Sequence, residues 1–191
     1  MSQSIRKQKQ ELRTELQRQR DRLSPDIAVE RSTRICSRIL EMELFRTSKI
    51  IHSYVPIHQK NEVDTLPIIR GAFERGKEVV VPKVVANHQL DHYRIERLGD
   101  LETGKWGIPE PVRGTLVSPE RLDLIFVPML AGDIFKNRLG FGRGYYDRLL
   151  LKTKAVKIGL LYHFQLFETP IPTDVFDIPM DLLVTEETIV R

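Results

Sequence analysis

Three stretches of the chain carry the periodicity of amphipathic helices. Residues 3–22 contain no Gly or Pro, and their apolar side chains form one narrow stripe. Ser24-Pro25-Asp26 has the composition of a helix start, with an N-cap, a proline in the first turn and a favourable acid. A third helix is predicted to begin at Asp64-Thr65 and to stop at Gly76.

Apolar runs between and after these helices predict strands of a buried sheet. The runs are residues 49–56, 78–82, 90–98, 122–128, 156–161 and 182–184. The first two end in proline, and the all-apolar ones need cover on both faces, as parallel strands do. Strands alternating with helices predict an α/β fold of Rossmann-like type, a largely parallel sheet in three layers with helices on both faces.

The length and composition of the chain fit one globular domain. The 191 residues of the chain can build one substantial core as a single domain, residues 1–191. They are too few for two domains that each have a full core. No apolar run is long enough to span a membrane, and the polar N-terminus argues against secretion. The single cysteine, Cys36, follows Ile35 in a helical pattern, which favours a core position and a reducing compartment. We therefore expect a cytoplasmic protein.

The net charge of the chain is concentrated in its first helix. Residues 1–22 hold seven basic and three acidic side chains, a net charge of +4 that equals the net charge of the whole chain. At about 100° per residue, four of the basic side chains border the apolar stripe, namely Arg6, Lys9, Arg13 and Arg20. They either reach into a cleft or extend along the helix border into water. This local charge favours one bound anion over a nucleic-acid surface.

Residues 137–148 concentrate the candidate chemistry. Three alternating glycines at 140, 142 and 144 follow Arg138, with Arg143 between the last two, and Tyr145-Tyr146-Asp147 comes next at the start of a predicted helix. Glycines allow positive φ and a close approach to a ligand, and arginine forks match phosphate oxygens. A helix N-terminus favours phosphate, and Asp147 in its first turn could hold a cation. The pattern predicts a phosphate-binding loop (the glycine loop, residues 140–144), with a plain tight turn as the alternative.

Residues 138–147 resemble the signature of the 5-formyltetrahydrofolate cyclo-ligase family, Arg-Leu-Gly-x-Gly-x-Gly-Tyr-Tyr-Asp. Weaker similarities are Lys9-x-x-x-Arg13, the segment that begins at Glu62 and the Gly-Ile-Pro-Glu-Pro segment at 107–111. The resemblance implies a ligase of one-carbon metabolism that uses ATP and Mg²⁺. Its reaction would close 5-formyltetrahydrofolate to 5,10-methenyltetrahydrofolate through a phosphorylated formyl group, with release of ADP and phosphate.

The resemblance also implies roles for individual residues. It places the nucleotide on Lys9, Arg13, Arg138, Leu139, Gly140, Phe141, Gly142, Arg143, Gly144, Tyr145 and Tyr146. Catalysis would fall to Arg138, Arg143 and Tyr145, and magnesium to Asp147 and Asp177. The folate would contact Val55, Glu62, Trp106 and Tyr145; Trp106 could instead cover the sheet edge. Two departures stand out, since Phe141 replaces a polar residue of some relatives and residues 133–137 lack a usual glycine.

Two other functions fit the residues alone. One is a different α/β enzyme acting on a phosphorylated small molecule, such as a sugar-phosphate isomerase. The other is a nucleic-acid-binding protein that uses the basic helix, although no RNA-recognition or zinc motif supports it. The resemblance favours a monomer that binds only small molecules, with a folate that either carries or lacks a polyglutamate tail.

Overall fold

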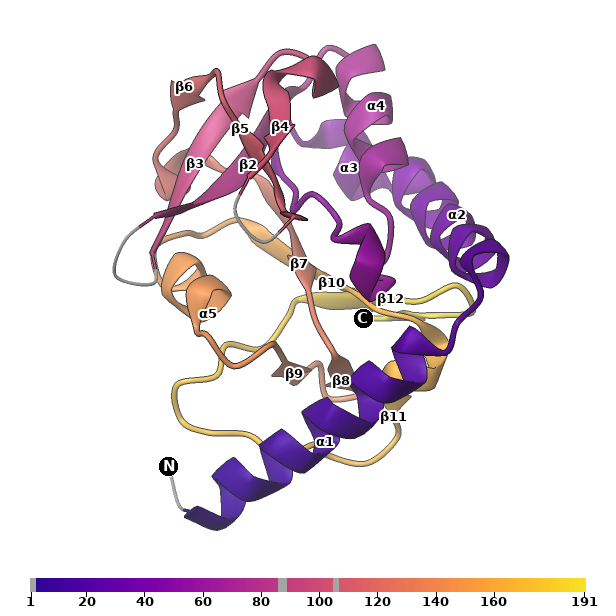
Figure 1. Ribbon diagram of the computed structural model, residues 1–191. Helices are drawn as coiled ribbons and strands as arrows, with labels where there is room; N and C mark the ends of the chain where they lie inside the picture. Colours follow the sequence, from indigo (N-terminus) through magenta and orange to yellow (C-terminus); the bar gives the residue numbers. More distant parts are fainter. Residues whose placement is uncertain (1–2, 86–88, 105–106) are drawn as a thin grey trace.

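The computed structural model describes residues 3–85, 89–104 and 107–191, and an eight-stranded sheet lies at the centre of these ranges (Figure 1). The strand order is β13-β12-β10-β7-β1-β2-β3-β6. The strands are β1 (Ile50–His52), β2 (Glu78–Val85), β3 (Gln89–Ile95), β6 (Thr115–Leu116), β7 (Leu124–Pro128), β10 (Val156–Leu160), β12 (Leu182–Val184) and β13 (Ile189–Val190). The five strands from β12 to β2 pair in parallel, and antiparallel strands complete both edges.

Helices cover both faces of this sheet, which confirms the predicted fold class. The helices are α1 (Gln3–Asp21), α2 (Pro25–Glu41), α3 (Glu43–Thr47), α4 (Leu66–Glu74) and α5 (Tyr145–Leu150). On one face Ile39 of α2 and Ile68 of α4 share a core with Phe126 of β7. On the other face Leu149 of α5 packs in a second core with Ile125 of β7. None of the helices in the described ranges is long and apolar enough to cross a lipid bilayer.

A small sheet carries α1 beside the main sheet. Its strands are β8 (Ala131–Asp133), β9 (Arg138–Leu139) and β11 (Leu166–Phe167), and Leu16 of α1 is buried against Ala131 and Leu139. A hairpin of β4 (Leu101–Thr103) and β5 (Pro109–Pro111) lies near β2. Short 3₁₀ turns are η1 (His58–Lys60), η3 (Leu98–Asp100), η5 (Pro119–Arg121) and η6 (His163–Gln165). The small sheet thus holds α1 next to the start of the glycine loop.

The turn between β8 and β9 forms without the glycine that is usual in the family. Lys136 takes a left-handed φ of 68°, a conformation that side chains other than glycine rarely adopt. The fully buried carboxylate of Asp133 stabilises this turn by accepting hydrogen bonds from the backbone N–H groups of Phe135 (2.9 Å) and Asn137 (3.0 Å). It also accepts one from the N–H of Ile171 (2.9 Å) and so fixes the turn to a distant loop.

Two predicted strand ends were wrong. β1 stops at His52, well before Pro56, and β2 continues through Pro82 to Val85. Beyond Val80, β2 pairs only with the antiparallel β3, so a residue without an N–H group is tolerated on its unpaired side. The predicted strand at 90–98 is this antiparallel partner, β3. A hydrophobic run does not reveal whether its neighbour is parallel or antiparallel.

The order of the parallel strands reverses at β1. From β1 the chain moves to β2 on one side, and later from β7 through β10 to β12 on the other. In such doubly wound sheets ligands bind at the carboxyl ends of the two strands that flank the reversal. Those ends here are His52 of β1 and Pro128 of β7. The segments that follow them lead to Glu62 and to the glycine loop.

Candidate active site

The glycine loop lies between β9 and α5 and turns against α1. Gly142 has φ +86° and Gly144 has φ +68°, so a side chain would be strained at either position. A Cβ atom at Gly142 would also lie 3.1 Å from Cζ of Arg13. These two glycines therefore allow the loop both to reverse and to approach the basic helix closely.

Arg138 and Asp147 form an ion pair at the two ends of the loop. Arg138 of β9 is 7% exposed, and its Nη2 donates to Oδ1 of Asp147 in the first turn of α5. Its Nε is buried and has no hydrogen-bond partner within the part of the chain that the structure describes. A buried guanidinium with a spare donor, held next to a glycine turn, can bind an oxyanion.

Helix α1 adds two more cations to this site. Lys9 is 2% exposed and its ammonium pairs with Oδ2 of Asp177, while Nε of Arg13 donates to the carbonyl of Gly140 (2.8 Å). Burial lowers the pKa of Arg13; the Asp177 carboxylate opposes this shift and the Arg138 guanidinium adds to it. The Lys9–Asp177 ion pair and the Arg13–Gly140 hydrogen bond thus join α1 to the Asp177 segment and to the glycine loop.

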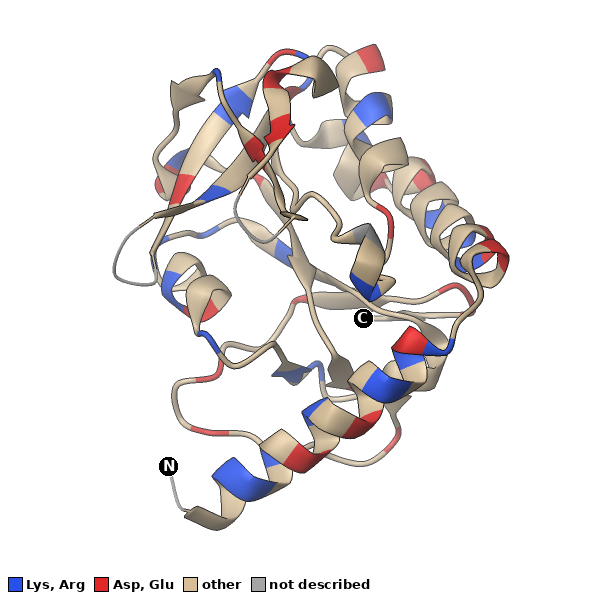
Figure 2. Cartoon of the chain, viewed as in Figure 1, with Lys and Arg blue, Asp and Glu red and all other residues tan. Residues whose placement is uncertain are grey.

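The basic edge of α1 is oriented as predicted with one exception. Lys9 and Arg20 are buried and Arg13 is half-buried, but Arg6 is exposed. Figure 2 shows how basic positions recur along the whole length of α1. By helical geometry Arg6 lies about 80° from Leu16, the farthest of the four from the buried stripe. The remaining basic side chains of the helix are exposed, namely Lys7, Arg18 and Arg22. An inward position is thus restricted to cations that directly border the stripe.

The expected folate residues follow the carboxyl end of β1. Val55 is buried, and Glu62 is half-buried with its Oε2 accepting a hydrogen bond from the N–H of Ile57 (2.9 Å). The Glu62 carboxylate raises the pKa of Tyr146 and counteracts the lowering of the Arg20 pKa by burial. The Glu62 carboxylate therefore acts electrostatically on one residue of α1 and on one residue of α5. Trp106 lies outside the described residues.

Phe141 joins the glycine loop to two cations. The guanidinium of Arg20 lies 5.3 Å from the centre of its ring, and the ammonium of Lys60 in η1 lies 5.8 Å from it. Cation–π contacts of this kind stabilise by about 0.5–2 kcal/mol. Phe141, the residue that departs from the family pattern, thus links the loop to α1 and to the segment that precedes Glu62.

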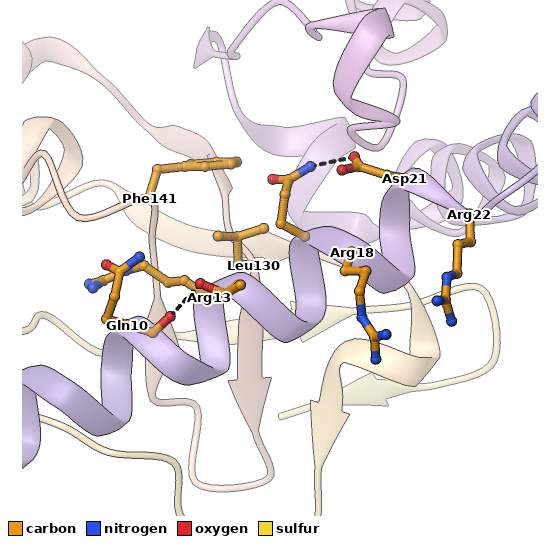
Figure 3. Close-up of a pocket in the computed structure, with 9 residues that line it drawn as sticks. Gln10, Arg13, Arg18, Asp21, Arg22, Leu130 and Phe141 are labelled. Atoms are coloured by element: carbon orange, nitrogen blue, oxygen red, sulfur yellow. Dashed lines mark hydrogen bonds between the residues drawn. The ribbon is translucent and has the colours of Figure 1, made fainter.

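An open groove of about 590 Å³ runs along α1 beside Phe141 (Figure 3). In the view of Figure 3, Phe141 and Leu130 lie above the helix, whereas Arg18 and Arg22 extend below it. Arg13 lines the same groove, so the groove borders the convergence of charges at the glycine loop. Its open shape makes it a surface approach to the loop and not an enclosed ligand pocket.

The other residues implied by the resemblance lie around the loop. Arg143 is exposed, and its carbonyl accepts a hydrogen bond from Nη2 of Arg148 (2.9 Å). The ring of Tyr145 is half-buried, with the Arg148 guanidinium 5.7 Å from its centre. Leu139 is buried beneath the loop, where its side chain packs with Leu16. The side chain of Leu139 therefore supports the loop from below, and Arg143 lies on its outer rim.

The helix that follows the loop is short, ending at Leu150 although the sequence up to Lys152 lacks Gly and Pro. Tyr145–Leu150 has six residues, so its dipole is small, and the backbone of Gly144 occupies the N-cap position. Most of the positive potential at the loop must therefore come from Arg138, Lys9 and Arg13 and not from the helix end.

Cys36 behaves as the core residue that the sequence predicts. Its side chain is buried, its Sγ donates to the carbonyl of Asp64 (3.0 Å), and burial raises the pKa of the thiol to about 12. A thiol that stays protonated at neutral pH is a weak nucleophile. The arrangement of the site therefore points to charge stabilisation and not to thiol catalysis.

A histidine pair next to Tyr146 was not predicted from the sequence. His52, the last residue of β1, is fully buried, and its Nε2 lies 3.2 Å from Nδ1 of His92 on β3. The two rings meet edge to face at 5.1 Å, and the Tyr146 ring lies 6.2 Å from His52. The signal was present, because a histidine interrupts the apolar strand run at residues 50–52. Its partner could not be recognised without the pairing of β2 with β3.

The histidine pair predicts a loss of stability in mild acid. Burial lowers the pKa of His92 from 6.5 to about 4, with Asp91 opposing and Lys152 assisting, and burial lowers that of His52 well below 6.5. Between these values the unfolded chain binds the proton and the native chain does not, so stability falls as pH falls from about 6.5 to 4. The His92 contribution is about 3 kcal/mol. The free energy of unfolding, measured with urea at several pH values, should fall less with decreasing pH in His92→Gln than in the wild-type chain. An identical fall in both proteins would contradict the assignment of this effect to His92.

Comparison with known proteins places this site in a family. The model of the 5-formyltetrahydrofolate cyclo-ligase family matches residues 5–186. A probable 5-formyltetrahydrofolate cyclo-ligase of Schizosaccharomyces pombe is 32% identical over 96% of this chain and 97% of its own length. The 5-formyltetrahydrofolate cyclo-ligase of Mus musculus is 30% identical over 97% of each chain.

Solved structures agree with the sequence comparisons. The 5,10-methenyltetrahydrofolate synthetase of Aquifex aeolicus is 41% identical, with a TM-score of 0.86 over 96% of this chain and 92% of that one. The Mycoplasma pneumoniae synthetase is 25% identical, with a TM-score of 0.76 over 93% and 98%. The match confirms the family that the sequence at 138–147 predicts. The chain belongs to the 5-formyltetrahydrofolate cyclo-ligase family.

Proposed function

We propose that this chain uses ATP to close 5-formyltetrahydrofolate to 5,10-methenyltetrahydrofolate. The observation that carries the proposal is a group of three cations at this site: Arg138 pairs with Asp147 at the end of the loop, Arg13 of α1 donates to the loop carbonyl of Gly140, and Lys9 of the same helix is buried against Asp177. Family membership supplies the substrate class, and the loop supplies a place for phosphate. Binding of phosphates at this loop would set the γ-phosphate toward the segment that holds Glu62.

The reaction needs charge stabilisation at two points. The formyl oxygen attacks the γ-phosphorus and ADP leaves; N10 then attacks the formyl carbon, loses its proton, and phosphate leaves. In this proposal Arg138 and Lys9 stabilise charge on the phosphates, Arg13 holds the loop and the nucleotide, and Arg143 approaches from the rim. The backbone of Leu139, Gly140, Phe141, Gly142, Gly144 and Tyr146 lines the nucleotide. Tyr145, Val55, Glu62 and Trp106 lie on the folate side.

Two carboxylates of the site, Asp147 and Asp177, fit a magnesium ion that is shared with the phosphates. The described residues contain no cluster of three or more His, Cys, Asp or Glu side chains that could hold a metal by itself. Mg²⁺ usually takes one or two carboxylates and completes its shell with phosphates and water. The side chains of Asp147 and Asp177 are 26% and 24% exposed, each is paired with a cation of the site, and they would serve as those two ligands. The ion would neutralise charge on the phosphates.

One assay tests the function directly. The purified chain is mixed with ATP, Mg²⁺ and 5-formyltetrahydrofolate, and the absorbance of the methenyl product is followed. We expect product and ADP in equal amounts, with no ADP when the folate is omitted. ADP release that does not depend on formylfolate would refute the proposal and would favour an enzyme acting on another small molecule. The enzyme is proposed to be a cytoplasmic monomer without nucleic-acid or membrane partners, which rests on the sequence alone.

A further inference from the structure

Two buried polar atoms meet where the order of the parallel strands reverses. The hydroxyl oxygen of Tyr146 and Nδ1 of His52 are both buried, and neither has a hydrogen-bond partner in the described ranges. The two rings lie 6.2 Å apart at an angle of 76°. Native proteins rarely leave buried polar groups unpaired, and a ligand that brings a partner relieves the cost. The reversal of a doubly wound sheet is also where ligands bind.

The Tyr146 ring is held firmly in this position. His52 packs edge to face against it from β1, and His92 of β3 hydrogen-bonds His52 from behind (3.2 Å). On the same helix, Leu149 and Leu150 are buried in the core beneath α5. The hydroxyl therefore has a fixed location, while the residue as a whole is only half-buried.

The charged groups around the hydroxyl come from both halves of the active site. Burial raises the pKa of Tyr146, the Glu62 carboxylate raises it further, and the Arg138 guanidinium opposes the shift. Glu62 belongs to the expected folate side and Arg138 to the phosphate side. A tyrosine hydroxyl without a partner in the described residues can donate one hydrogen bond to a ligand oxygen.

We propose that Tyr146 contacts the folate directly, through a hydrogen bond from its hydroxyl to a carbonyl oxygen of the formylpterin head group. The His52–His92 pair positions the ring for this bond. The inference rests on the proposed function and deepens it. It gives the side chain of Tyr146 a role on the folate side, whereas its backbone belongs to the nucleotide loop.

The test removes the hydroxyl and keeps the ring. Tyr146→Phe is expected to raise KM for 5-formyltetrahydrofolate about tenfold, the loss of one hydrogen bond to substrate, and to leave KM for ATP within about twofold. Because the hydroxyl has no partner in the described protein, the midpoint of urea unfolding should stay the same or rise. In Tyr54→Phe, by contrast, a hydroxyl that donates to the carbonyl of Val63 (2.8 Å) is lost, so that midpoint should fall.

The positioning role of the histidines has its own test. His92→Leu removes the hydrogen bond to His52 and should raise KM for the folate several-fold, whereas His92→Gln keeps a polar partner and should restore most of it. Equal KM values for the folate in His92→Leu and His92→Gln would show that the histidine pair does not position Tyr146.

The outcomes separate this inference from the function on which it rests. An unchanged KM for the folate in Tyr146→Phe, or a lowered unfolding midpoint with both KM values raised alike, would show that Tyr146 is only structural. If the wild-type chain forms no methenyl product, the proposed function fails first and the assignment of Tyr146 fails with it.

Discussion

Replacing Arg138 by alanine is expected to lower turnover about 10²–10³-fold, the usual effect of losing one charge-stabilising donor in an active site. The reason is structural, since Arg138 is 7% exposed and holds its guanidinium at the edge of the glycine loop. Arg138→Lys keeps the charge but loses the planar fork, so its loss should be smaller, about tenfold. Steady-state formation of the methenyl product measures both.

Two controls separate catalysis from folding in this experiment. Arg138→Ala also leaves Asp147 without its partner, so the unfolding midpoint of each variant is measured and rates are compared where the protein is folded. Arg70→Ala removes an exposed arginine of α4 and should leave turnover unchanged. Full turnover in folded Arg138→Ala would exclude Arg138 from the reaction.

Lys9→Met should reduce kcat/KM for ATP by about 10–100-fold, which corresponds to about 1.4–2.8 kcal/mol of transition-state stabilisation. Methionine keeps much of the apolar stem but removes a buried ammonium and leaves Asp177 uncompensated. The change should therefore also destabilise the fold, in proportion to the burial of the pair. Turnover at several ATP concentrations, with unfolding measured in parallel, distinguishes the two effects.

The chain offers a matched control two residues away. Lys7 is on the same helix, its side chain is 79% exposed, and its contact with Glu11 is 3.9 Å. Lys7→Met removes the same charge from the same helix and should change stability by less than about 0.5 kcal/mol. If Lys9→Met and Lys7→Met behave alike, net charge and not a bound phosphate explains the basic helix.

Local patterns were enough to predict most elements of the fold. The boundaries of α1 and β12 match the sequence closely, because a helix without Gly or Pro and a buried apolar run each leave a strong periodic signal. The direction of a strand was harder to predict. An antiparallel neighbour of β2, such as β3, carries apolar residues similar to those of a parallel neighbour. Pro82 therefore suggested a strand end, although it lies inside β2 at a position with a partner on one side only.

The part of the site that lies within one short segment was predictable from the sequence. The glycine loop and its two flanking ionisable groups, Arg138 and Asp147, lie within ten residues, so the motif was visible in the sequence. The contacts that complete the site were not, since Phe141 meets Arg20 and Lys60 only after folding. The same holds for the histidine pair behind Tyr146, whose members come from β1 and β3.

A crystal structure with a non-hydrolysable ATP analogue and Mg²⁺ would show where the nucleotide binds. We expect the β- and γ-phosphates within hydrogen-bond distance of the backbone N–H groups of residues 140–144, with Arg138 and Lys9 turned toward them. Asp147 should then contact the magnesium ion. A nucleotide bound elsewhere, with the loop empty and both ion pairs intact, would contradict the account.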